Sequence, residues 1–468
     1  MAEVNQRIPK RILSGLLSSI SAGVVPRMGA PYIAIGRNEE IEALLSDLEA
    51  VNDGGGSMRF IIGKYGSGKS FLIQLVRGYA LERGFITADA DLSPERRICG
   101  AKGTGIATYR ELIKNLASKS SPDGGALGQI IAKWLSDVQS SVAADGYELG
   151  SDEFVRRLNA KIYEQTRELE AEIGGFDFAT VLSGYYKAYT AGDEEKKSAC
   201  MRWLRGEYST KTEARNATGI LLGGIIDDDN WYEYIKLLAV FFRKIGYRGF
   251  VVFIDECVNL YKITNRVSRE NNYEKLLSMF NDTLQGKAEG LALIFGGTPQ
   301  FLEDTRRGLF SYEALRSRLS DGQFQKAGFK NLIGPVIRLR RLSDDELFAL
   351  IARITNLHAQ NYSWQPRVTT EEMAAFLKVC LERAGADTMI TPREIIRDYI
   401  TVLNILLQNP DTTFSDVVGS GVVKLEHEPE TAVAEASESA VGTNSEASES
   451  AVGGKSEASD LDLEDIEL

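Results

Sequence analysis

Residues 63–70 combine glycines, a lysine and a serine at a spacing that suits the binding of phosphate groups. The run reads Gly63-Lys64-Tyr65-Gly66-Ser67-Gly68-Lys69-Ser70. Its glycines let backbone N–H groups turn towards an anion, Lys69 can reach the β- and γ-phosphates of a nucleotide, and the Ser70 hydroxyl can ligate Mg²⁺. An apolar run ends at Ile62 and a helix-like run begins at Phe71, the strand–loop–helix context that this chemistry requires. We therefore predict that residues 63–71 bind ATP with Mg²⁺, rather than forming a glycine-rich turn without a ligand.

Two acidic residues follow another apolar run and extend this chemistry. Phe250–Ile254 reads as a buried strand, and Asp255 and Glu256 come directly after it. Hydrolysis of a nucleoside triphosphate needs a metal-bound phosphate chain and an oriented water. We expect Asp255 to hold the Mg²⁺ shell and Glu256 to polarise the attacking water. An apolar run ending in Asp-Glu is common by itself, but downstream of a phosphate-binding loop it favours hydrolysis over binding alone.

Four apolar runs predict the strands that position these groups. They are Phe60–Ile62, Phe85–Ala90, Phe250–Ile254 and Leu291–Phe295. Helix-like stretches lie between the first and second and between the second and third of these runs, as the βαβ units of a parallel sheet flanked by helices require. We read residues 31–335 as an α/β nucleotide-binding domain and about 120–225, which is mostly helix-like, as a helical insertion in it. A helix-like stretch at Lys10–Ile20 suggests a separate N-terminal helical segment, residues 1–30.

The pattern becomes all-helical after residue 343. Ser343, Thr369 and Thr391 each precede acidic residues at the start of a helix-like stretch, as N-caps do, and Pro392 suits a first-turn position. These stretches predict a helical lid over residues 336–423. From Lys424 the chain is of low complexity and contains two similar repeats, 435–445 and 446–456. Such a segment cannot bury enough apolar surface to offset its ordering entropy, so we predict a disordered acidic tail over 424–468.

The tail also accounts for the net charge of the chain, which is −12. From Glu426 onward there are 13 acidic residues and one lysine, and the remaining body carries 53 acidic and 53 basic residues. A neutral body argues neither for nor against a face that binds nucleic acid. The last residues, 461–468, alternate apolar and acidic side chains. They could form a linear docking motif, or they could simply keep the chain in solution.

Composition argues against several classes of protein. No apolar run is long enough to span a bilayer, and the N-terminus lacks the pattern of a signal peptide, so we expect no membrane association. Scattered cysteines and the phosphate-binding loop together suggest the reducing cytoplasm. None of the cysteines or histidines shows metal-ligand spacing: Cys99, Cys200, Cys257, Cys380, His358 and His427.

Taken together, these features resemble the AAA+ ATPases over about residues 30–420, apart from the insertion. Gly36 and Arg37, in the run Ile35–Glu40, are similar to a box that lies along the adenine pocket in the initiator and helicase-loader branch. Glycine and asparagine also suit a plain turn before a helix. Thr298 follows the strand Leu291–Phe295 as sensor 1 does, where a polar side chain contacts the γ-phosphate. The alternative for Thr298 is a helix cap.

Three arginines extend the resemblance. Arg318, with Arg316 as the second choice, lies in a segment that looks like an arginine finger, which enters the neighbouring subunit's site and stabilises transition-state charge. A plain surface helix is the alternative. Arg393 matches the sensor 2 position early in a lid helix, where an ordinary surface arginine would gain nothing from the helix dipole. The resemblance therefore implies a ring or filament homo-oligomer whose sites are shared between subunits.

A narrower resemblance rests on four segments of the chain, which are Phe60–Leu72, Asp89–Arg97, Tyr312–Leu319 and Thr391–Glu394. Together they look like the ATP-binding protein family encoded in BREX (bacteriophage exclusion) and related bacterial defence loci. This resemblance implies a role in antiphage defence beside other proteins of the system, such as a helicase-like or nuclease-like partner. It leaves open which step the protein performs.

Three functions follow from these interpretations. The first is an oligomeric ATPase that loads, remodels or gates a partner on DNA. The second is a slow nucleotide-dependent signalling switch, although no sensor repeats and no effector domain are recognisable unless the helical insertion is the sensor. The third, a small-molecule kinase, is opposed by the Asp255-Glu256 pair, the arginine segment and the C-terminal helices. Direct DNA contact stays open, because the sequence contains no zinc finger, no RNP motif and no clear helix-turn-helix after the lid.

Overall fold

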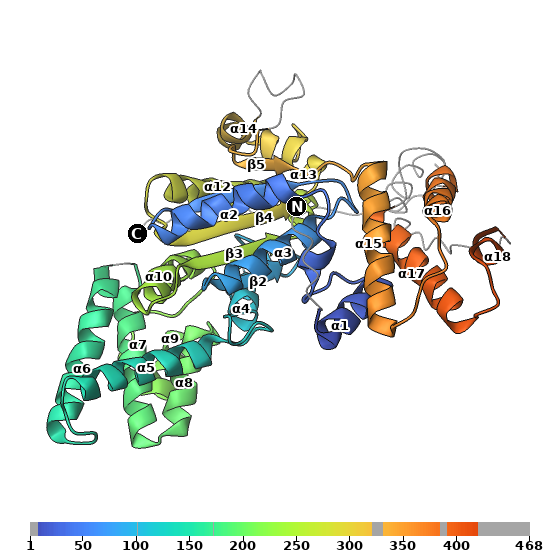
Figure 1. Cartoon of the computed structure of the whole chain (residues 1–468). Helices are drawn as coiled ribbons and strands as arrows, with labels where there is room; N and C mark the ends of the chain where they lie inside the picture. The colour runs from blue at the N-terminus through green and yellow to red at the C-terminus, as the bar shows by residue number, and fades with distance from the viewer. Residues whose placement is uncertain (1–7, 101, 172, 321–330, 384–390, 420–468) are drawn as a thin grey trace, which may run out of the picture. The chain divides into compact units, whose positions relative to one another are not determined.

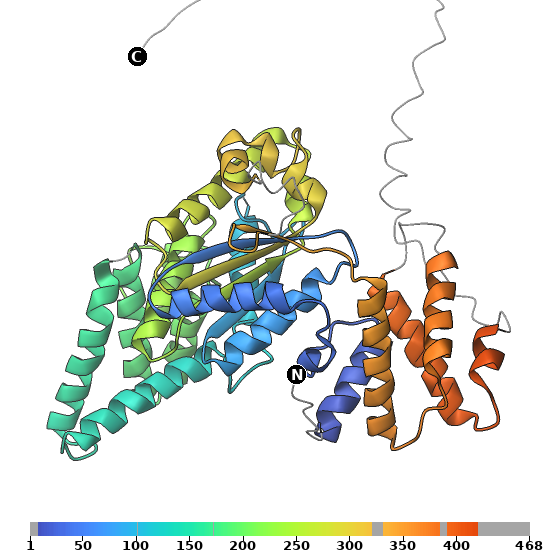
Figure 2. The same cartoon turned by 45° about the horizontal axis from the view of Figure 1, so that its top comes forward.

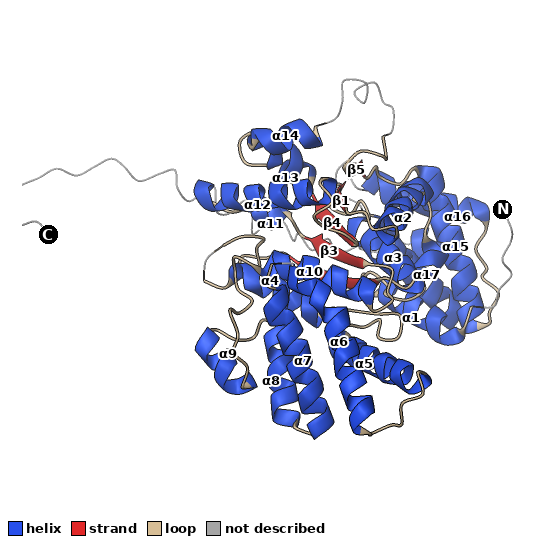
Figure 3. Cartoon of the chain, turned by 90° about the vertical axis from the view of Figure 1, so that its left-hand side faces the viewer, coloured by secondary structure: helices blue, strands red, loops and turns tan. Residues whose placement is uncertain are grey.

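Five parallel strands form the sheet at the centre of the described residues (Figure 3). This computed structural model describes residues 8–100, 102–171, 173–320, 331–383 and 391–419. The strands lie in the order β2-β3-β4-β1-β5. Their bounds are β1 (Ser57–Ile62), β2 (Ile86–Asp91), β3 (Phe250–Asp255), β4 (Leu291–Gly297) and β5 (Val336–Arg338). The predicted α/β class and the four predicted strands are confirmed, and β5 is an additional strand.

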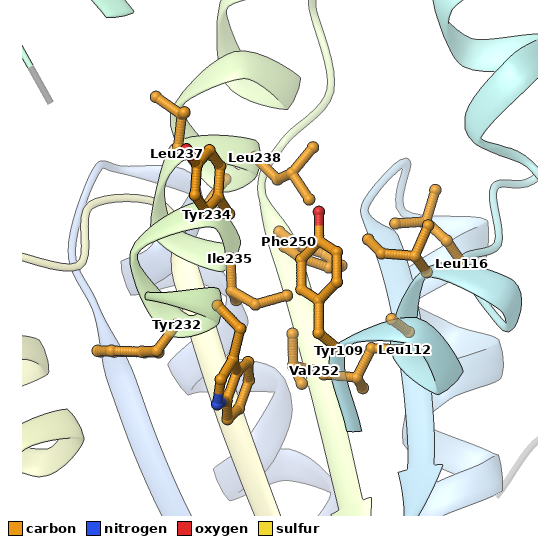
Figure 4. Packing of buried hydrophobic residues seen from close by; sticks show 14 of the residues in the cluster. Tyr109, Leu112, Leu116, Tyr232, Tyr234, Ile235, Leu237, Leu238, Phe250 and Val252 are labelled. Carbon is orange, nitrogen blue, oxygen red and sulfur yellow. The ribbon is translucent and has the colours of Figure 1, made fainter. Parts of the chain in front are cut away.

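Helices cover both faces of this sheet (Figures 1 and 2). On one face lie α2 (Asn38–Asn52) and α3 (Lys69–Glu82), packed on Val251 and Phe253. The other face contacts α4 (Thr104–Lys114), α10 (Trp231–Lys244) and α12 (Arg266–Leu284). Figure 4 shows Tyr109 and Ile235 of that layer beside Phe250 and Val252. Because successive side chains of β3 enter opposite cores, the strand reads as one continuous apolar run.

The helix-rich insertion lies between α4 and α10. Its elements are α5 (Leu127–Ala144), α6 (Asp152–Arg167), η2 (Glu168–Ala171), α7 (Gly175–Ala191), α8 (Glu194–Leu204) and α9 (Lys211–Thr218). Edge-on aromatic contacts join the insertion to α10. The ring centroid of Phe241 lies 5.3 Å from that of Trp134 and 5.7 Å from that of Phe178. Asp228 then caps the start of α4 by accepting backbone N–H groups of Gly103 and Ile106 at 2.7 and 2.8 Å. The insertion is therefore packed on the same core that supports β3.

Short elements follow β3 and β4 at the carboxyl edge of the sheet. They are α11 (Val258–Tyr261), α13 (Pro299–Glu303), η3 (Leu309–Ser311) and α14 (Glu313–Leu319). Near the N-terminus, η1 (Ala30–Ile33) contacts α3. The carboxyl edge is where polar side chains of parallel strands meet, so these elements surround the predicted chemistry.

Three of the described C-terminal helices begin where the sequence predicts, and a fourth, short helix was not predicted. They are α15 (Asp344–Tyr362), α16 (Thr370–Arg383), α17 (Pro392–Gln408) and α18 (Phe414–Gly419). Ser343 and Thr391 form complete capping boxes, and the Thr369 hydroxyl accepts the backbone N–H of Glu372. Helix α1 (Lys10–Ser21) packs against α15 and α17, and its Ser14 hydroxyl donates to Asn361 Oδ1 at 2.7 Å (Figures 1 and 2). The first described helix thus belongs to the same bundle as the last ones.

The predicted acidic tail, residues 424–468, and His427 lie outside the described residues. Within the described ranges, no helix combines the length and the apolar character that crossing a membrane would need.

His358 gives the C-terminal helices a pH dependence. Its buried ring accepts a hydrogen bond from Trp364 Nε1 at Nδ1, 2.9 Å away, and Nε2 lies 3.0 Å from Asn404 Oδ1, which fixes a neutral tautomer. Burial lowers the pKa of His358. Because the folded pKa lies below the unfolded value of about 6.5, stability is complete above that pH and is lost as the pH falls through the folded pKa.

We expect the melting temperature to fall between pH 7 and pH 5 more steeply in the wild-type protein than in His358→Gln. Protonation opposes the hydrogen bond from Trp364, which is partly buried, and a donor that loses its acceptor costs at most about 1–3 kcal/mol. Thermal unfolding followed by circular dichroism at both pH values measures the difference. Equal slopes for the two proteins would assign the acid sensitivity to other groups.

Candidate functional site

The phosphate-binding loop leaves the carboxyl end of β1 and opens helix α3. Gly66 and Gly68 have φ angles of 73° and 88°, a region that favours glycine, and Gly68 is the N-cap of α3. The Lys69 ammonium donates to the carbonyls of Gly63 and Lys64 at 3.0 and 3.3 Å. Burial lowers the pKa of Lys69, and the charges of Asp255 and Glu256 oppose that shift. The backbone of the loop therefore curves around the Lys69 ammonium and holds it with two carbonyl groups.

Ser70 and Asp255, the two predicted Mg²⁺ ligands, lie side by side. The Ser70 hydroxyl donates to Asp255 Oδ2 at 2.8 Å, although the residues are far apart in the sequence. The carboxylate of Asp255 is nearly buried, and its other oxygen accepts the backbone N–H of Glu256 at 2.8 Å. A hydroxyl beside a carboxylate is an all-oxygen donor set that fits Mg²⁺. Within the described ranges no three His, Cys, Asp or Glu side chains form a metal cage, so phosphate and water oxygens would complete the coordination.

Glu256 sits in a strained turn between β3 and α11. Its φ angle is 56°, which is uncommon for a residue other than glycine. The turn is fixed on both sides, because Cys257 N donates to Gly296 O and Asn259 N donates to Glu256 O, each at 3.0 Å. The side chain is exposed and lines the same cavity as Lys69 and Ser70. The carboxylate is thus presented towards the phosphate-binding loop.

Gly296 in β4 leaves room for the Asp255 carboxylate. A Cβ added at Gly296 would overlap Asp255 Oδ1. We expect Gly296→Ala to cost about 1–3 kcal/mol of unfolding free energy through overpacking, and to weaken Mg²⁺-dependent nucleotide binding. Chemical denaturation and titration with a fluorescent ATP analogue measure the two effects.

Gly78 supplies the matched control for that substitution, because nothing lies within 4 Å of a Cβ added there in the middle of α3. Gly78→Ala is expected to stabilise the protein by about 0.5–1 kcal/mol and to leave nucleotide binding unchanged. Unchanged binding in Gly296→Ala would contradict the role given to the Asp255 position.

A cavity of about 290 Å³ extends from the loop to an apolar end. Loop residues from Tyr65 to Phe71 form one end together with Glu256. The other end is apolar and is built from α1 and the segment after it, the approach to α2, and the C-terminal helices with the residue before their first cap: Ile20, Val24, Val25, Pro26, Ile33, Ile35, Leu342, Leu350 and Ile396. A charged end beside an apolar end matches the phosphates and the base of a nucleotide.

Arg37 holds the phosphate-binding loop through hydrogen bonds to backbone carbonyls. It is buried, and its guanidinium donates to the carbonyls of Ser67 at 2.9 Å and Arg340 at 2.7 Å. Gly36 has a φ angle of 72°, and a Cβ there would overlap the Glu346 carboxylate of α15. Arg37 also lines the cavity, whereas Gly36 faces the C-terminal helices. The two residues therefore tie the phosphate-binding loop to the segments around the apolar end.

Arg393 reaches the cavity from the first turn of α17. Its neighbour Thr391 caps that helix, and a Cβ at Gly66 would overlap the Thr391 methyl group. The helix start thus touches the loop directly. A cation of the C-terminal helices therefore lines the same cavity as the loop, and its aliphatic carbons lie near Gly23.

Thr298, Arg316 and Arg318 are not among the residues that line this cavity. The Thr298 hydroxyl caps α13 by accepting the backbone N–H of Phe301 at 3.3 Å, which agrees with its alternative reading as a cap. Arg316 and Arg318 are exposed on α14. Arg316 lies 3.6 Å from the Glu313 carboxylate, and Arg318 donates to Ala314 O at 2.8 Å. Neither arginine lines the cavity of its own chain.

Asp91 is a candidate that the sequence analysis did not single out. It ends β2 in register with Asp255 of β3. Partial desolvation and the nearby charges of Asp255 and Glu256 raise its pKa. The signal in the sequence was an aspartate at the end of the strand after the phosphate-binding loop. The apolar wall formed by residues 20–26 was missed as well, because no motif marks it.

Comparison with known families gives one match that spans nearly the whole chain. The model described as BREX system ATP-binding protein BrxC/D matches residues 8–421. A search of curated protein sequences gave no match. The matched range contains every described element of the cavity.

Proposed function

This chain belongs to the family of BREX system ATP-binding proteins BrxC/D, and from that premise we propose that it is a AAA+ ATPase that hydrolyses ATP with Mg²⁺. The observation that carries the proposal is the 2.8 Å hydrogen bond from Ser70 to Asp255, because Ser70 lines a cavity together with Lys69 and Glu256. Membership of the BREX system gives the protein an ATP-binding role in phage defence among other proteins of that system.

The residues of the loop and of β3 divide the chemistry between them. Backbone N–H groups of residues 64–70 hold the phosphates, helped by the N-terminus of α3. Lys69 exchanges its carbonyl acceptors for phosphate oxygens when ATP enters. Bound Mg²⁺ would be held by Ser70 and, through water, by Asp255, and it supplies positive charge against the phosphate oxygens. Glu256 orients and polarises the attacking water, and Arg393 adds positive charge from the α17 side.

The proposed assembly follows from the arginines on α14. Arg318, or Arg316, lies outside the cavity of its own chain, so a neighbouring copy would have to supply it in a ring or filament. We propose that residues 31–335 form the nucleotide-binding domain and 336–423 the lid. Turnover in this assembly would load, remodel or gate a helicase-like or nuclease-like defence protein on DNA.

Release of inorganic phosphate by the purified protein tests the proposal. We expect multiple turnovers with Mg²⁺, none after chelation by EDTA, and loss of ATP binding in Lys69→Ala, because that ammonium holds the phosphates. Phosphate is measured continuously with and without duplex DNA. A wild-type protein that binds ATP and stops after one turnover would contradict the proposed ATPase and favour a nucleotide-dependent switch.

A further inference from the structure

Arg307 joins the acidic pair of β3 to the helix that carries Arg316 and Arg318. Its guanidinium lies over the ring of Tyr261, 5.3 Å from the centroid, and donates to the Tyr261 carbonyl at 3.3 Å. Tyr261 is the last residue of α11, the single helical turn that begins directly after Glu256 and Cys257. One side of the contact is therefore tied to the turn that presents Glu256.

The other side of the contact is tied to α14 through a tightly organised loop. Asp304 Oδ1 accepts the backbone N–H groups of Arg306 and Arg307 at 2.7 and 3.0 Å, and Asp304 Oδ2 accepts the Tyr261 hydroxyl at 3.2 Å. These backbone donors lower the pKa of Asp304, so its carboxylate is charged at neutral pH. The carbonyl of Arg307 accepts the hydroxyl of buried Tyr273 at 2.6 Å.

The chain has little freedom between this loop and the arginines. A Cβ at Gly308 would lie 2.7 Å from Gln300 O, so the backbone passes closely over α13. Leu309, Leu315 and Leu319 are buried, and α14 packs on η3 and α12. A shift of Arg307 therefore moves the start of α14 rather than being absorbed by a flexible linker.

We propose that Arg307 is a positioning residue that couples the nucleotide site of one subunit to the arginine helix that this subunit offers to the next. The proposal rests on the proposed function, because it requires ATP hydrolysis at sites completed by a neighbouring copy. ATP bound beside Glu256 sets the position of α11, and the stack of Tyr261 on Arg307 sets the position of α14 with it. A planar guanidinium suits this task, since it stacks on the Tyr261 ring while it donates to the carbonyls of Tyr261 and Ile263 at 3.3 and 3.5 Å.

The test compares Arg307→Ala with Arg306→Ala in the full-length chain. Arg306 is the adjacent exposed arginine, and its side chain is not part of the Tyr261 stack. Arg307→Ala should bind a fluorescent ATP analogue as the wild type does, while its kcat falls about tenfold to a hundredfold through misplacement of the finger. Arg306→Ala should keep wild-type affinity and wild-type kcat.

Mixed assemblies separate positioning from a local structural effect. An excess of Glu256→Gln subunits, which carry intact arginine helices, should restore turnover at the sites of Arg307→Ala subunits. The same excess should not restore it when the donors also carry Arg316→Ala and Arg318→Ala. The proposal is overturned if donors with intact arginine helices fail to restore turnover. It is also overturned if donors that lack Arg316 and Arg318 do restore turnover. Wild-type kcat in Arg307→Ala overturns it as well.

Two further outcomes are interpretable. Should Arg307→Ala not fold, Arg307→Lys keeps the charge without the planar stack and gives the same readouts. Absence of turnover in the wild-type protein overturns the proposed hydrolysis together with this coupling. If the wild-type protein turns over ATP and substitutions of Arg307 leave kcat unchanged, the coupling is overturned and the proposed hydrolysis stands.

Discussion

Glu256→Gln lowers the rate of ATP turnover about 10²- to 10⁴-fold, the contribution expected of a positioned acid–base group. Glutamine keeps the shape of the side chain in the turn between β3 and α11 but cannot accept the proton of the attacking water. Lys69, Ser70 and Asp255 remain in place, so ATP and Mg²⁺ still bind. The variant should therefore accumulate in the ATP-bound, assembled state, which mass photometry and single-turnover kinetics measure.

Glu256→Asp is the informative control for this substitution, because it keeps the charge and withdraws the carboxylate by one methylene. We expect an intermediate rate for it. Full turnover by Glu256→Gln would remove Glu256 from the chemistry and turn attention to Asp91, a carboxylate in register with Asp255 at this edge of the sheet.

Arg318→Ala should lower kcat about 10³- to 10⁵-fold, the range of an arginine finger, with little change in ATP affinity. The reason is geometric: Arg318 is exposed on α14 and lies outside the cavity of its own chain, so it contributes nothing to the binding of ATP there. Binding of a fluorescent ATP analogue and the rate of phosphate release measure the two quantities separately.

Arg316→Ala distinguishes the two arginines of α14. Arg316 lies 3.6 Å from the Glu313 carboxylate on the same helix, an exposed pair that contributes little to stability. We expect a smaller loss of turnover than for Arg318→Ala. A larger loss would reassign the finger to Arg316, and wild-type rates in both variants would contradict the shared site.

The chemistry at the phosphate end was readable because it depends on residue types in fixed local order. Residues 63–70 are contiguous, and the Asp255-Glu256 pair follows a strand whose two faces are both buried. Such a strand must be apolar at every position, so it stands out in the sequence. The helix starts at Ser343 and Thr391 were equally readable, since capping boxes are local patterns of hydrogen bonding.

What the sequence could not reveal depends on packing between distant segments. Strand β5 has three residues, Val336–Arg338, and is a strand because of its pairing with β1. Helix α12 was missed because part of its buried face is polar. There Asn272 accepts the backbone N–H groups of Ile98 and Cys99 at 3.1 and 2.9 Å. The hydrogen bond from Arg37 to Ser67 and the register that sets Asp91 beside Asp255 arise in the same way.

The packing of α1 on α15 and α17 has a consequence for the order in which the protein is made. Ile20 and Ile396 line the same cavity although they lie near opposite ends of the described chain. During synthesis Ile20 therefore leaves the ribosome long before Ile396. At about 5–20 residues per second, the interval between them is on the order of tens of seconds. During that interval the sheet and the phosphate-binding loop can fold while α1 lacks its partners and exposes its apolar face. The complete nucleotide cavity therefore forms last in synthesis, and a nascent chain cannot hold ATP in it before the C-terminal helices have emerged.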